Sequence, residues 1–467
     1  MLFTSFEYLF VFLPLLVCVF LALRRLGFDA ASRYWLLLAS LGFYASDGWL
    51  NLPYLVLSIV LNAWLGAKIV HCADPKMKRQ FLSFGLVANI GLLIVIKYRV
   101  LLLGPFGFTS AGSVAVPSGI SFFTLVQVMY LTDCYEGLAK PNTAINHALF
   151  VSFFPYVMMG PLVRTRDVQS LLAPQDARAA ALDDIAPGIE QICVGLFKKT
   201  VFAQSFVFFV DTGWGQNRPL TFVEAWITTI AFAFELYFDF SGYSDMAVGA
   251  ARLLGVKLPA NFDSPYKCKS VIEFWRRWHI TLSNFITTYM YTPLLRARKK
   301  PTFSWAMCAT VFSMAVAGLW HGAQWTFLIF GILHGVALAI NHLWRKTKRR
   351  IPSALGWTLT FAFVASSLVL FRAPDMGRAL KMYNGLLGAG AVLGLDREAF
   401  LGGSVTLVRV VVALVGVVVC FFAPNSNTIA KSFESSGRRA LIGAVLFVIA
   451  LVFMNSLSAK EFIYREF

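Results

Sequence analysis

Apolar segments of about twenty residues recur along almost the whole chain and restrict what it can fold into. A helix needs about twenty mostly apolar residues to cross the hydrocarbon core of a bilayer. The composition agrees, because 58% of the 467 residues are hydrophobic and only 14% are charged, whereas soluble domains are about 25% charged. The sequence therefore predicts an all-α, polytopic membrane protein and excludes a water-soluble globular domain.

We expect about ten to twelve transmembrane helices plus re-entrant or interfacial helices, all in a single integral domain at 1–467. The apolar segments are 6–23, 34–45, 52–70, 81–96, 120–134, 148–159, 189–210, 222–238, 302–319, 325–343, 357–370, 405–422 and 441–454. The first lacks a basic leader and a cleavage site, so it is expected to be a retained helix. The polar, aromatic segment at about 239–300 is expected to be re-entrant or interfacial.

Basic residues outnumber acidic residues, 41 to 24, which gives a formal net charge of +17. They are concentrated in short loops at 24–25, 76–79, 164–178, 296–300 and 345–350. Loops of this kind are typical of the cytoplasmic side of a membrane protein. Membrane topology therefore explains the excess better than a nucleic-acid partner, and we expect no such partner.

The sequence lacks the motifs that would indicate several other kinds of site. The seven cysteines are scattered without a C-x-x-C pair, so neither a disulfide framework nor a metal site is predicted. The sequence also has no P-loop, no dinucleotide fingerprint and no H-E-x-x-H motif.

The pentapeptide GLWHG at 318–322 places His321 between two apolar segments. Ionisable groups at membrane depth usually face the protein interior or a wet cavity and mark functional sites. A neutral core histidine, or one that marks a helix end at the interface, is the structural alternative. Four of the six histidines lie near segment ends with no polar cluster around them: His71, His147, His334 and His342.

The run EFWRRWH at 273–279 supplies the second histidine among converging polar residues, His279. Helical spacing puts Trp275, Trp278 and His279 on one side and Glu273, Arg276 and Arg277 on another. Because tryptophan and arginine at a membrane edge are commonly interfacial anchors, this run by itself favours anchoring over catalysis.

The run DFSGYSD at 239–245 ends an apolar segment with two carboxylates and two serines. A metal site with two carboxylates and no third ligand would be weak. We expect instead that Asp239 or Ser241 caps a helix beginning near Asp245, with Gly242 in the turn. A triad of Ser241, His321 and Asp245 is an alternative, although no nucleophile elbow surrounds Ser241.

These motifs resemble the membrane-bound O-acyltransferase family, specifically its bacterial alginate O-acetyltransferase branch. Two segments of the chain, 273–283 and 318–322, together look like the signature of that family. The motif at 239–245 is separated from the motif at 274–280 as it is in the family. Other motifs of the branch follow in order: MLFTSF at 1–6, FLP at 12–14, GISFFT at 119–124, FFP at 153–155, GP at 160–161, GLFKK at 195–199 and EFIY at 461–464. The resemblance covers the whole chain, with a core at about 117–345.

The resemblance implies an acyltransferase in which His321 is essential and His279 is the second histidine of the site. An imidazole with a near-neutral pKa can take the proton of an acceptor hydroxyl. No metal is expected, and the residues expected to support the site are Asp239, Ser241, Tyr243, Asp245, Glu273, Trp275, Arg276, Arg277, Trp278, Ser283 and Trp320.

The resemblance also implies a tunnel through which a cytosolic donor and an external acceptor reach His321 from opposite sides. Acetyl-CoA is the expected donor, and no bound cofactor is expected. The basic loops could bind its phosphates, but membrane topology explains them equally well. A periplasmic acetyltransferase-type partner protein and a polysaccharide acceptor are expected. The expected location is the bacterial inner (plasma) membrane, among its lipids.

The sequence departs from the branch after Ser283, where NFITTY at 284–289 replaces the usual WFRDY and Leu295-Arg296 replaces a Gly-Gly pair. The departure concerns the acceptor or the partner, because both histidines are kept. O-acetylation of an exported polysaccharide is the first hypothesis. The alternatives are D-alanyl transfer to teichoic acid, as in a sister branch, and a membrane transporter, against which the absence of an internal repeat counts.

Overall fold

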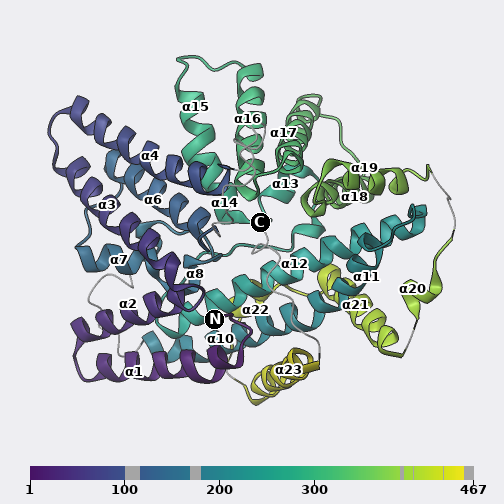
Figure 1. The fold of residues 1–467 in the computed structure, drawn as a ribbon, viewed down its shortest axis with the longest axis horizontal. Coiled ribbons are helices and arrows are strands. Elements are labelled where there is room, and N and C mark those ends of the chain that lie inside the picture. The colour runs from purple at the N-terminus through teal and green to yellow at the C-terminus, as the bar shows by residue number, and fades with distance from the viewer. Residues whose placement is uncertain (100–115, 169–179, 390–393, 403, 435, 457–467) are drawn as a thin grey trace. The chain divides into compact units, whose positions relative to one another are not determined.

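The computed structural model describes residues 1–99, 116–168, 180–389, 394–402, 404–434 and 436–456. Helices predominate and these ranges contain no β-strand (Figure 1). The all-α fold predicted from the sequence is therefore confirmed. The basic loop at 164–178 lies partly outside the described residues, and the EFIY motif at 461–464 lies wholly outside them.

The described helices that could cross a membrane number eight by length and apolarity. They are Glu7–Arg25, Trp49–His71, Pro75–Lys97, Asp184–Trp214, Phe303–His321, Trp325–Lys346, Ser353–Arg372 and Gly437–Met454. Leu407–Phe422 is a shorter apolar helix. Two further segments predicted as crossings form α2 (Asp29–Ala45), which has 17 residues, and α12 (Phe222–Leu253), which carries acidic and basic side chains along its length.

The chain divides into two compact units. Unit 1 is Met1–Cys193, Tyr243–Ala260 and Phe433–Gly443, and unit 2 is Val194–Gly242, Asn261–Ser432 and Ala444–Phe467. Unit 1 includes α1 (Leu13–Arg25), α2, α3 (Leu52–His71), α4 (Pro75–Lys97), α6 (Ile120–Tyr135), α7 (Ala144–Ser152) and α8 (Phe154–Val157).

Polar side chains tie α3, α4 and α6 of unit 1 together. Asn62 and Asn89 exchange amide hydrogen bonds of 3.1 and 2.7 Å, and the Gln127 amide donates to the Ser58 carbonyl at 3.2 Å. All four side chains are buried. The polar residues of 120–134 therefore face protein, as expected for a segment that cannot expose amides to lipid.

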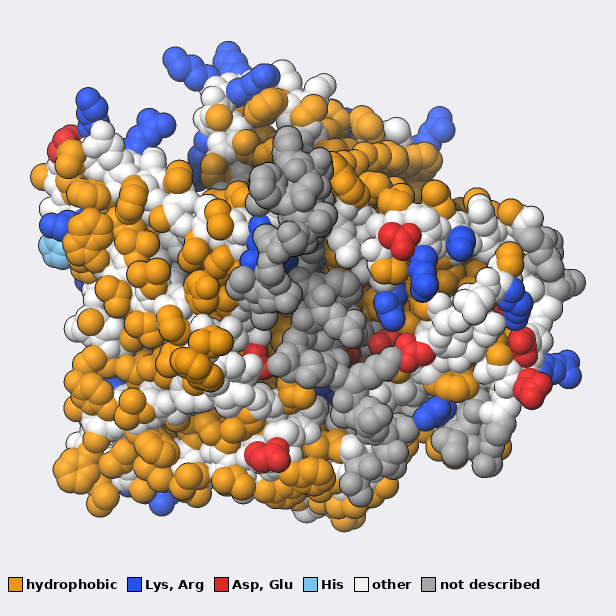
Figure 2. All heavy atoms as spheres, in the orientation of Figure 1, with side chains coloured by type: hydrophobic (Ala, Val, Ile, Leu, Met, Phe, Trp, Pro, Cys, Tyr) orange, Lys and Arg blue, Asp and Glu red, His pale blue; other side chains and the backbone are white. Residues whose placement is uncertain are grey.

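The outer faces of α1, α3 and α4 are apolar (Figure 2). Exposed side chains on them include Leu15, Leu57, Val60, Val87 and Val95. Exposed apolar surface on helices of this length is what a lipid environment requires, because lipid tails replace the protein neighbours of a soluble core.

Unit 2 contains the segments around both candidate histidines. Its principal elements are η5 (Lys198–Ala203), α11 (Gln204–Trp214), α13 (Val271–Trp275), α14 (Ile280–Phe285), η7 (Ile286–Tyr291), α15 (Thr292–Arg296), α16 (Phe303–His321), α17 (Trp325–Lys346), α18 (Ser353–Arg372), α19 (Met376–Leu386), α20 (Arg397–Leu401), α21 (Ser404–Phe422) and α22 (Ser426–Lys431). α10 (Ala180–Phe197), α12 and α23 (Gly437–Ser456) contribute residues to both units.

Glycines allow α16 and α17 to pack closely. A Cβ atom on Gly318 would lie 2.2 Å from the Phe327 carbonyl oxygen, and one on Gly331 would lie 2.2 Å from the Met314 carbonyl oxygen. Neither position accepts a larger residue without separating the helices. This packing holds the short connection between α16 and α17, and with it His321.

The predicted turn at 239–245 is wrong, because α12 continues without a break from Phe222 to Leu253. Asp239 and Ser241 lie inside this helix and cap nothing. Gly242 instead permits a close approach, since a Cβ atom there would lie 2.7 Å from the Gly195 carbonyl oxygen. The polar run reflects buried polar side chains within a helix, and the re-entrant or interfacial character of 239–300 stays a prediction.

Candidate active site

His321 is the last residue of α16, and its side chain is 7% exposed. The helix begins where Thr302 accepts a hydrogen bond from the Trp305 amide at 3.2 Å. It ends because Gly322 adopts an extended conformation at a point where a Cβ atom would lie 2.1 Å from the Phe327 ring. The tight connection to α17 thus directs the histidine into a buried environment.

His279 lies between α13 and α14 rather than on a helix that continues from Glu273. α13 ends at Trp275, and His279 has the left-handed backbone angles φ 42° and ψ 55°. Such angles cost a non-glycine residue about 1–2 kcal/mol. Backbone hydrogen bonds from Ile280 to Asn261 and from Asp263 to Arg277, both 2.9 Å, hold the turn in place.

The side chain of Asn261 determines which nitrogen of His279 carries hydrogen. The backbone N–H of Thr281 donates to Asn261 Oδ1 at 3.4 Å, which identifies that atom as an acceptor. His279 Nδ1, 3.1 Å from the same atom, must therefore carry its hydrogen. The lone pair then belongs to Nε2, which is buried and has no hydrogen-bond partner among the described residues.

Burial lowers the pKa of His279 to about 3. The imidazole is therefore neutral at physiological pH, because desolvation disfavours the charged ring. A neutral ring with an unused lone pair on Nε2 can accept a hydrogen bond.

Trp320 brings the two histidines into one region of unit 2. Its ring centroid lies 6.4 Å from that of His279 and 5.0 Å from that of His321. Phe240 packs edge-on against His279 at 4.8 Å, and Phe371 against His321 at 5.2 Å. Both imidazoles therefore lie among aromatic rings, where the low local dielectric strengthens any interaction with charge that develops nearby.

Asp239 lies in unit 2, and Lys199 of η5 donates a hydrogen bond to its Oδ1 in a buried ion pair. The sequence places Lys199 in an apolar segment but does not reveal its partner. Ser241 is buried, and its hydroxyl oxygen has no hydrogen-bond partner in the part of the chain that the structure describes. The alternative triad through Ser241 is therefore not formed.

Tyr243 and Asp245 belong to unit 1. The Tyr243 ring stacks on Phe3, with centroids 4.8 Å apart and an interplanar angle of 3°. Asp245 is buried within the same unit.

The charged residues of the 273–279 run lie toward the surface. Glu273 and Arg277 form an ion pair of 2.8 Å and are both 34% exposed, and Arg276 is exposed. Glu273 also accepts a hydrogen bond from the Lys269 amide, while Ser270 caps α13. These charges stabilise the start of α13 and do not contact either imidazole in a described hydrogen bond.

Trp278 packs between Phe262 and Phe274, with ring centroids at 5.1 and 5.5 Å. Ser283 donates to the Trp278 carbonyl at 3.3 Å. Both residues therefore shape the turn that carries His279 without contacting its imidazole in a described hydrogen bond.

The prediction that His334 lies near a segment end without polar neighbours is wrong. This residue lies within α17, is 1% exposed, and its Nδ1 accepts a hydrogen bond from Trp275 Nε1 at 3.2 Å. Its Nε2 therefore carries hydrogen and lies 2.9 Å from the Ser367 hydroxyl oxygen. Trp275 contributes to this cluster, and no spacing rule could have paired residues 59 positions apart.

Among the described residues, no three His, Cys, Asp or Glu side chains gather into a group that could hold a metal ion. The fold and the site thus define a multi-pass membrane protein with two buried histidines beside one tryptophan.

Comparison with known proteins places this arrangement in a family. Residues 49–376 match the model of the membrane-bound O-acyltransferase family. The chain is 34% identical to the peptidoglycan O-acetyltransferase of Helicobacter pylori, over 97% of either chain. It is 32% identical to the probable alginate O-acetylase AlgI of Pseudomonas aeruginosa, over 95% of this chain and 86% of that protein. The protein therefore belongs to the membrane-bound O-acyltransferase family and is an O-acyltransferase.

A more distant relative is the teichoic acid D-alanyltransferase of Streptococcus thermophilus. It is 29% identical over 54% of this chain and 67% of that protein. The relatives named for O-acetyl transfer thus match more of the chain, which fits O-acetylation of a cell-surface polysaccharide.

Proposed function

We propose that the protein takes acetyl from cytosolic acetyl-CoA and delivers it across the bacterial inner membrane to hydroxyl groups of an exported polysaccharide. The full-length similarity to O-acetylating relatives supports acetyl as the cargo in preference to D-alanyl. The basic loops at 296–300 and 345–350, whose side chains are exposed, suit the phosphates of a cytosolic donor. A periplasmic acetyltransferase-type partner is proposed to complete delivery.

The observation that carries this proposal is that both imidazoles border Trp320 while Nε2 of His279 keeps its lone pair. In the proposed reaction, an acceptor hydroxyl oxygen forms a bond to the acetyl carbonyl carbon and the thioester C–S bond breaks. His321 takes the hydroxyl proton and passes it to the departing thiolate. His279 assists by accepting a hydrogen bond from a bound substrate at Nε2. General-base catalysis of this kind contributes about 10²–10⁴-fold in rate.

The proposal is tested by following labelled acetyl from acetyl-CoA in membranes that contain the protein. Label is scored on polysaccharide and on protein for the wild-type chain, His321→Ala, and the matched control His71→Ala. His71 is exposed and bonds only the Ala67 carbonyl among described residues. We expect His321→Ala to lose transfer while its amount in the membrane stays unchanged, and His71→Ala to keep full transfer.

Full transfer by His321→Ala would refute the role of this histidine. Label from D-alanine on the polymer, with none from acetyl-CoA, would show that the transferred group is D-alanyl and not acetyl. Transfer that occurs only after a secreted partner is added would support delivery through that partner.

A further inference from the structure

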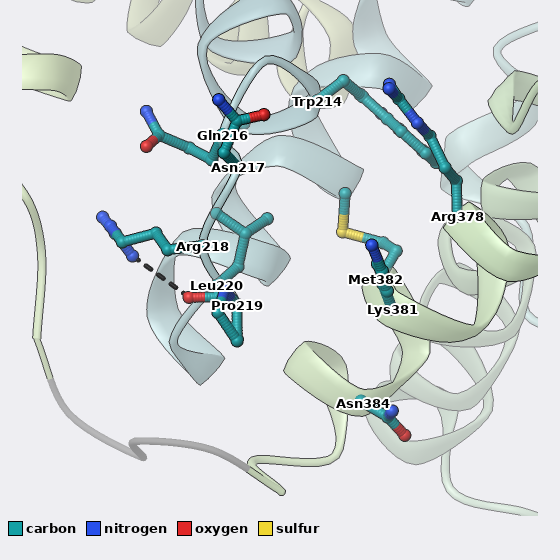
Figure 3. A pocket seen from close by; sticks show the side chains of 11 residues that line it. Trp214, Gln216, Asn217, Arg218, Pro219, Leu220, Arg378, Lys381, Met382 and Asn384 are labelled. Atoms are coloured by element: carbon teal, nitrogen blue, oxygen red, sulfur yellow. Dashed lines mark hydrogen bonds between the residues drawn. The ribbon is translucent and has the colours of Figure 1, made fainter.

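A pocket of about 280 Å³ lies in unit 2, between the connection that joins α11 to α12 and one side of α19 (Figure 3). Nothing in the proposed chemistry uses it. The end of α11 contributes Gly213 and Trp214, the connection contributes Gln216, Asn217, Arg218, Pro219 and Leu220, and α19 contributes Arg378, Lys381, Met382 and Asn384. Its volume is just below the usual range for ligand sites, about 300–1,000 Å³, which suits one sugar unit better than a long segment of polymer.

The pocket has an excess of positive charge. Arg218 is already paired, because it bonds both Glu224 oxygens at 2.7 and 2.8 Å. Arg378 and Lys381 are exposed, and neither side chain has a hydrogen-bond or ion-pair partner among the described residues. None of the described lining residues is Asp or Glu. Two cations therefore remain available to an anionic ligand.

The other lining side chains have the chemistry that recognises a sugar. Trp214, Leu220 and Met382 supply apolar walls, against which the C–H faces of a pyranose can pack. Three side-chain amides have no described hydrogen-bond partner and can both donate to and accept from hydroxyl groups: Gln216, Asn217 and Asn384.

The walls of the pocket are fixed relative to each other. Trp226 of α12 donates to the Leu386 carbonyl at 3.2 Å, and the Tyr383 hydroxyl donates to the Ser366 carbonyl of α18 at 3.1 Å. A Cβ atom on Gly385 would lie 2.9 Å from that of Ala225, so α19 packs directly against the start of α12. A preformed site loses less entropy when it binds a ligand.

The pocket lies at the end of α18 that is opposite the basic loop at 345–350. The 20 residues of α18 extend about 30 Å, which is the thickness of the hydrocarbon core. Because basic loops mark the cytoplasmic side, the pocket belongs to the external side. Phe371 contacts the His321 ring, and the next residue, Arg372, lies 5.9 Å from the Trp214 ring centroid. The pocket and His321 are thus linked through adjacent residues of α18.

From this placement and chemistry we infer that the pocket binds a carboxylate-bearing sugar of the acceptor polysaccharide, with Arg378 and Lys381 on the carboxylate. The inference rests on the proposed function for the identity of the acceptor. The pocket selects acidic acceptors and holds the polymer on the external side while a neighbouring hydroxyl is acetylated.

The test measures binding of a uronic-acid tetrasaccharide and of a neutral glucose tetrasaccharide to the purified full-length protein in phosphatidylcholine nanodiscs, without an acetyl donor. Arg378→Gln/Lys381→Gln is compared with a control that removes the same charge at the other end of α18, Arg349→Gln/Arg350→Gln. We expect the wild type and the control to prefer the acidic ligand by about tenfold and the pocket variant to lose that preference. Added salt should weaken acidic binding in the first two proteins only.

Equal binding of the acidic ligand by the pocket variant and the wild type, at unchanged melting temperature, would overturn the inference. Binding of soluble glycerol phosphate that the pocket variant loses, with no binding of the acidic tetrasaccharide, would also overturn it, by assigning the pocket to a lipid phosphate. Binding is repeated with His321→Ala, which should bind like the wild type. Selective binding combined with no acetyl transfer by the wild type would refute the proposed function and leave the pocket assignment standing.

Discussion

The clusters around His279 and His334 are two regions of unit 2 that look alike and differ in one respect. Both imidazoles are 1% exposed and both contact aromatic rings. His334 uses both nitrogens, one with Trp275 and one with Ser367. His279 uses Nδ1 with Asn261 and leaves Nε2 without a described partner.

The difference shows that burial does not identify a reactive histidine. A buried polar atom without a partner costs about 1–3 kcal/mol, and a ligand or substrate that bonds to the atom would offset that cost. The comparison therefore predicts a chemical role for the His279 cluster and a structural role for the His334 cluster. Four changes can break or sharpen that assignment.

The largest effect is expected from His279→Asn. The asparagine amide can still donate to Asn261, because it replaces Nδ1, but the variant has nothing in the place of Nε2. Acetyl transfer at equal protein concentration should fall by about 10²–10⁴-fold, with little change in melting temperature. Transfer at the wild-type rate would show that His279 Nε2 is not needed for the reaction, and the predicted functional difference between the two clusters would be wrong.

Ser367→Ala should affect stability and not chemistry. It removes the partner of His334 Nε2 and leaves a buried donor without a hydrogen bond, which costs about 1–3 kcal/mol in the free energy of unfolding. Transfer per folded molecule should be unchanged. The control is Ser366→Ala, because the Ser366 hydroxyl bonds only the Phe363 carbonyl among described residues. A selective loss of transfer in Ser367→Ala would place His334 in the reaction.

A smaller effect is expected from Asn261→Leu, which frees Nδ1 and removes control over the tautomer of His279. Transfer should fall by about 10–100-fold, as when hydrogen-bond partners of other functional histidines are removed. Asn261→Asp keeps the acceptor and adds a charge that raises the pKa of His279. The acidic limb of its pH–rate profile should therefore move to higher pH, a shift that a purely structural role of Asn261 does not produce.

The smallest effect concerns the dependence of stability on pH. The ordinary histidine pKa of 6.5 is lowered to about 3 at His279 by burial. Between these values the unfolded chain binds a proton that the folded protein does not, so stability falls as pH falls through this window. The contribution is about 1.4 kcal/mol per pH unit. In detergent, the stability of the wild type measured from melting curves should fall more steeply with falling pH than the stability of His279→Asn. The same pH dependence in both proteins would contradict the burial of a neutral ring.

The sequence predicted the membrane class and the family correctly, because both follow from local patterns. Segment length and apolarity report on the bilayer, whatever packs around each helix. The segments 273–283 and 318–322 carry the family signature in their residues alone, and residues 49–376 match the family model. Trp275, Trp278 and His279 are buried and Glu273, Arg276 and Arg277 are more exposed, as the predicted division implied, although the run does not form one helix.

Predictions from local sequence patterns were wrong where contacts between residues far apart in the chain determine the structure. The polar run at 239–245 was interpreted as a turn, because hydropathy cannot distinguish an exposed polar residue from one buried inside a helix. Lys199 lies against Asp239 across two helical segments and Gly242 against Gly195, and these contacts bury the polar run within α12. The left-handed turn at His279 likewise depends on backbone hydrogen bonds to 261–263.

Sequence by itself determined that this protein is a membrane O-acyltransferase with histidines at 279 and 321. Tertiary structure alone decided which ring nitrogen of His279 is available, that His334 is saturated, and that Arg378 and Lys381 face a pocket beside α11. The physical reason is that a hydrogen bond or a cavity wall needs two groups in contact. The chain brings those groups together from positions that no periodic pattern relates, as Asn261 and His279 do across 18 residues.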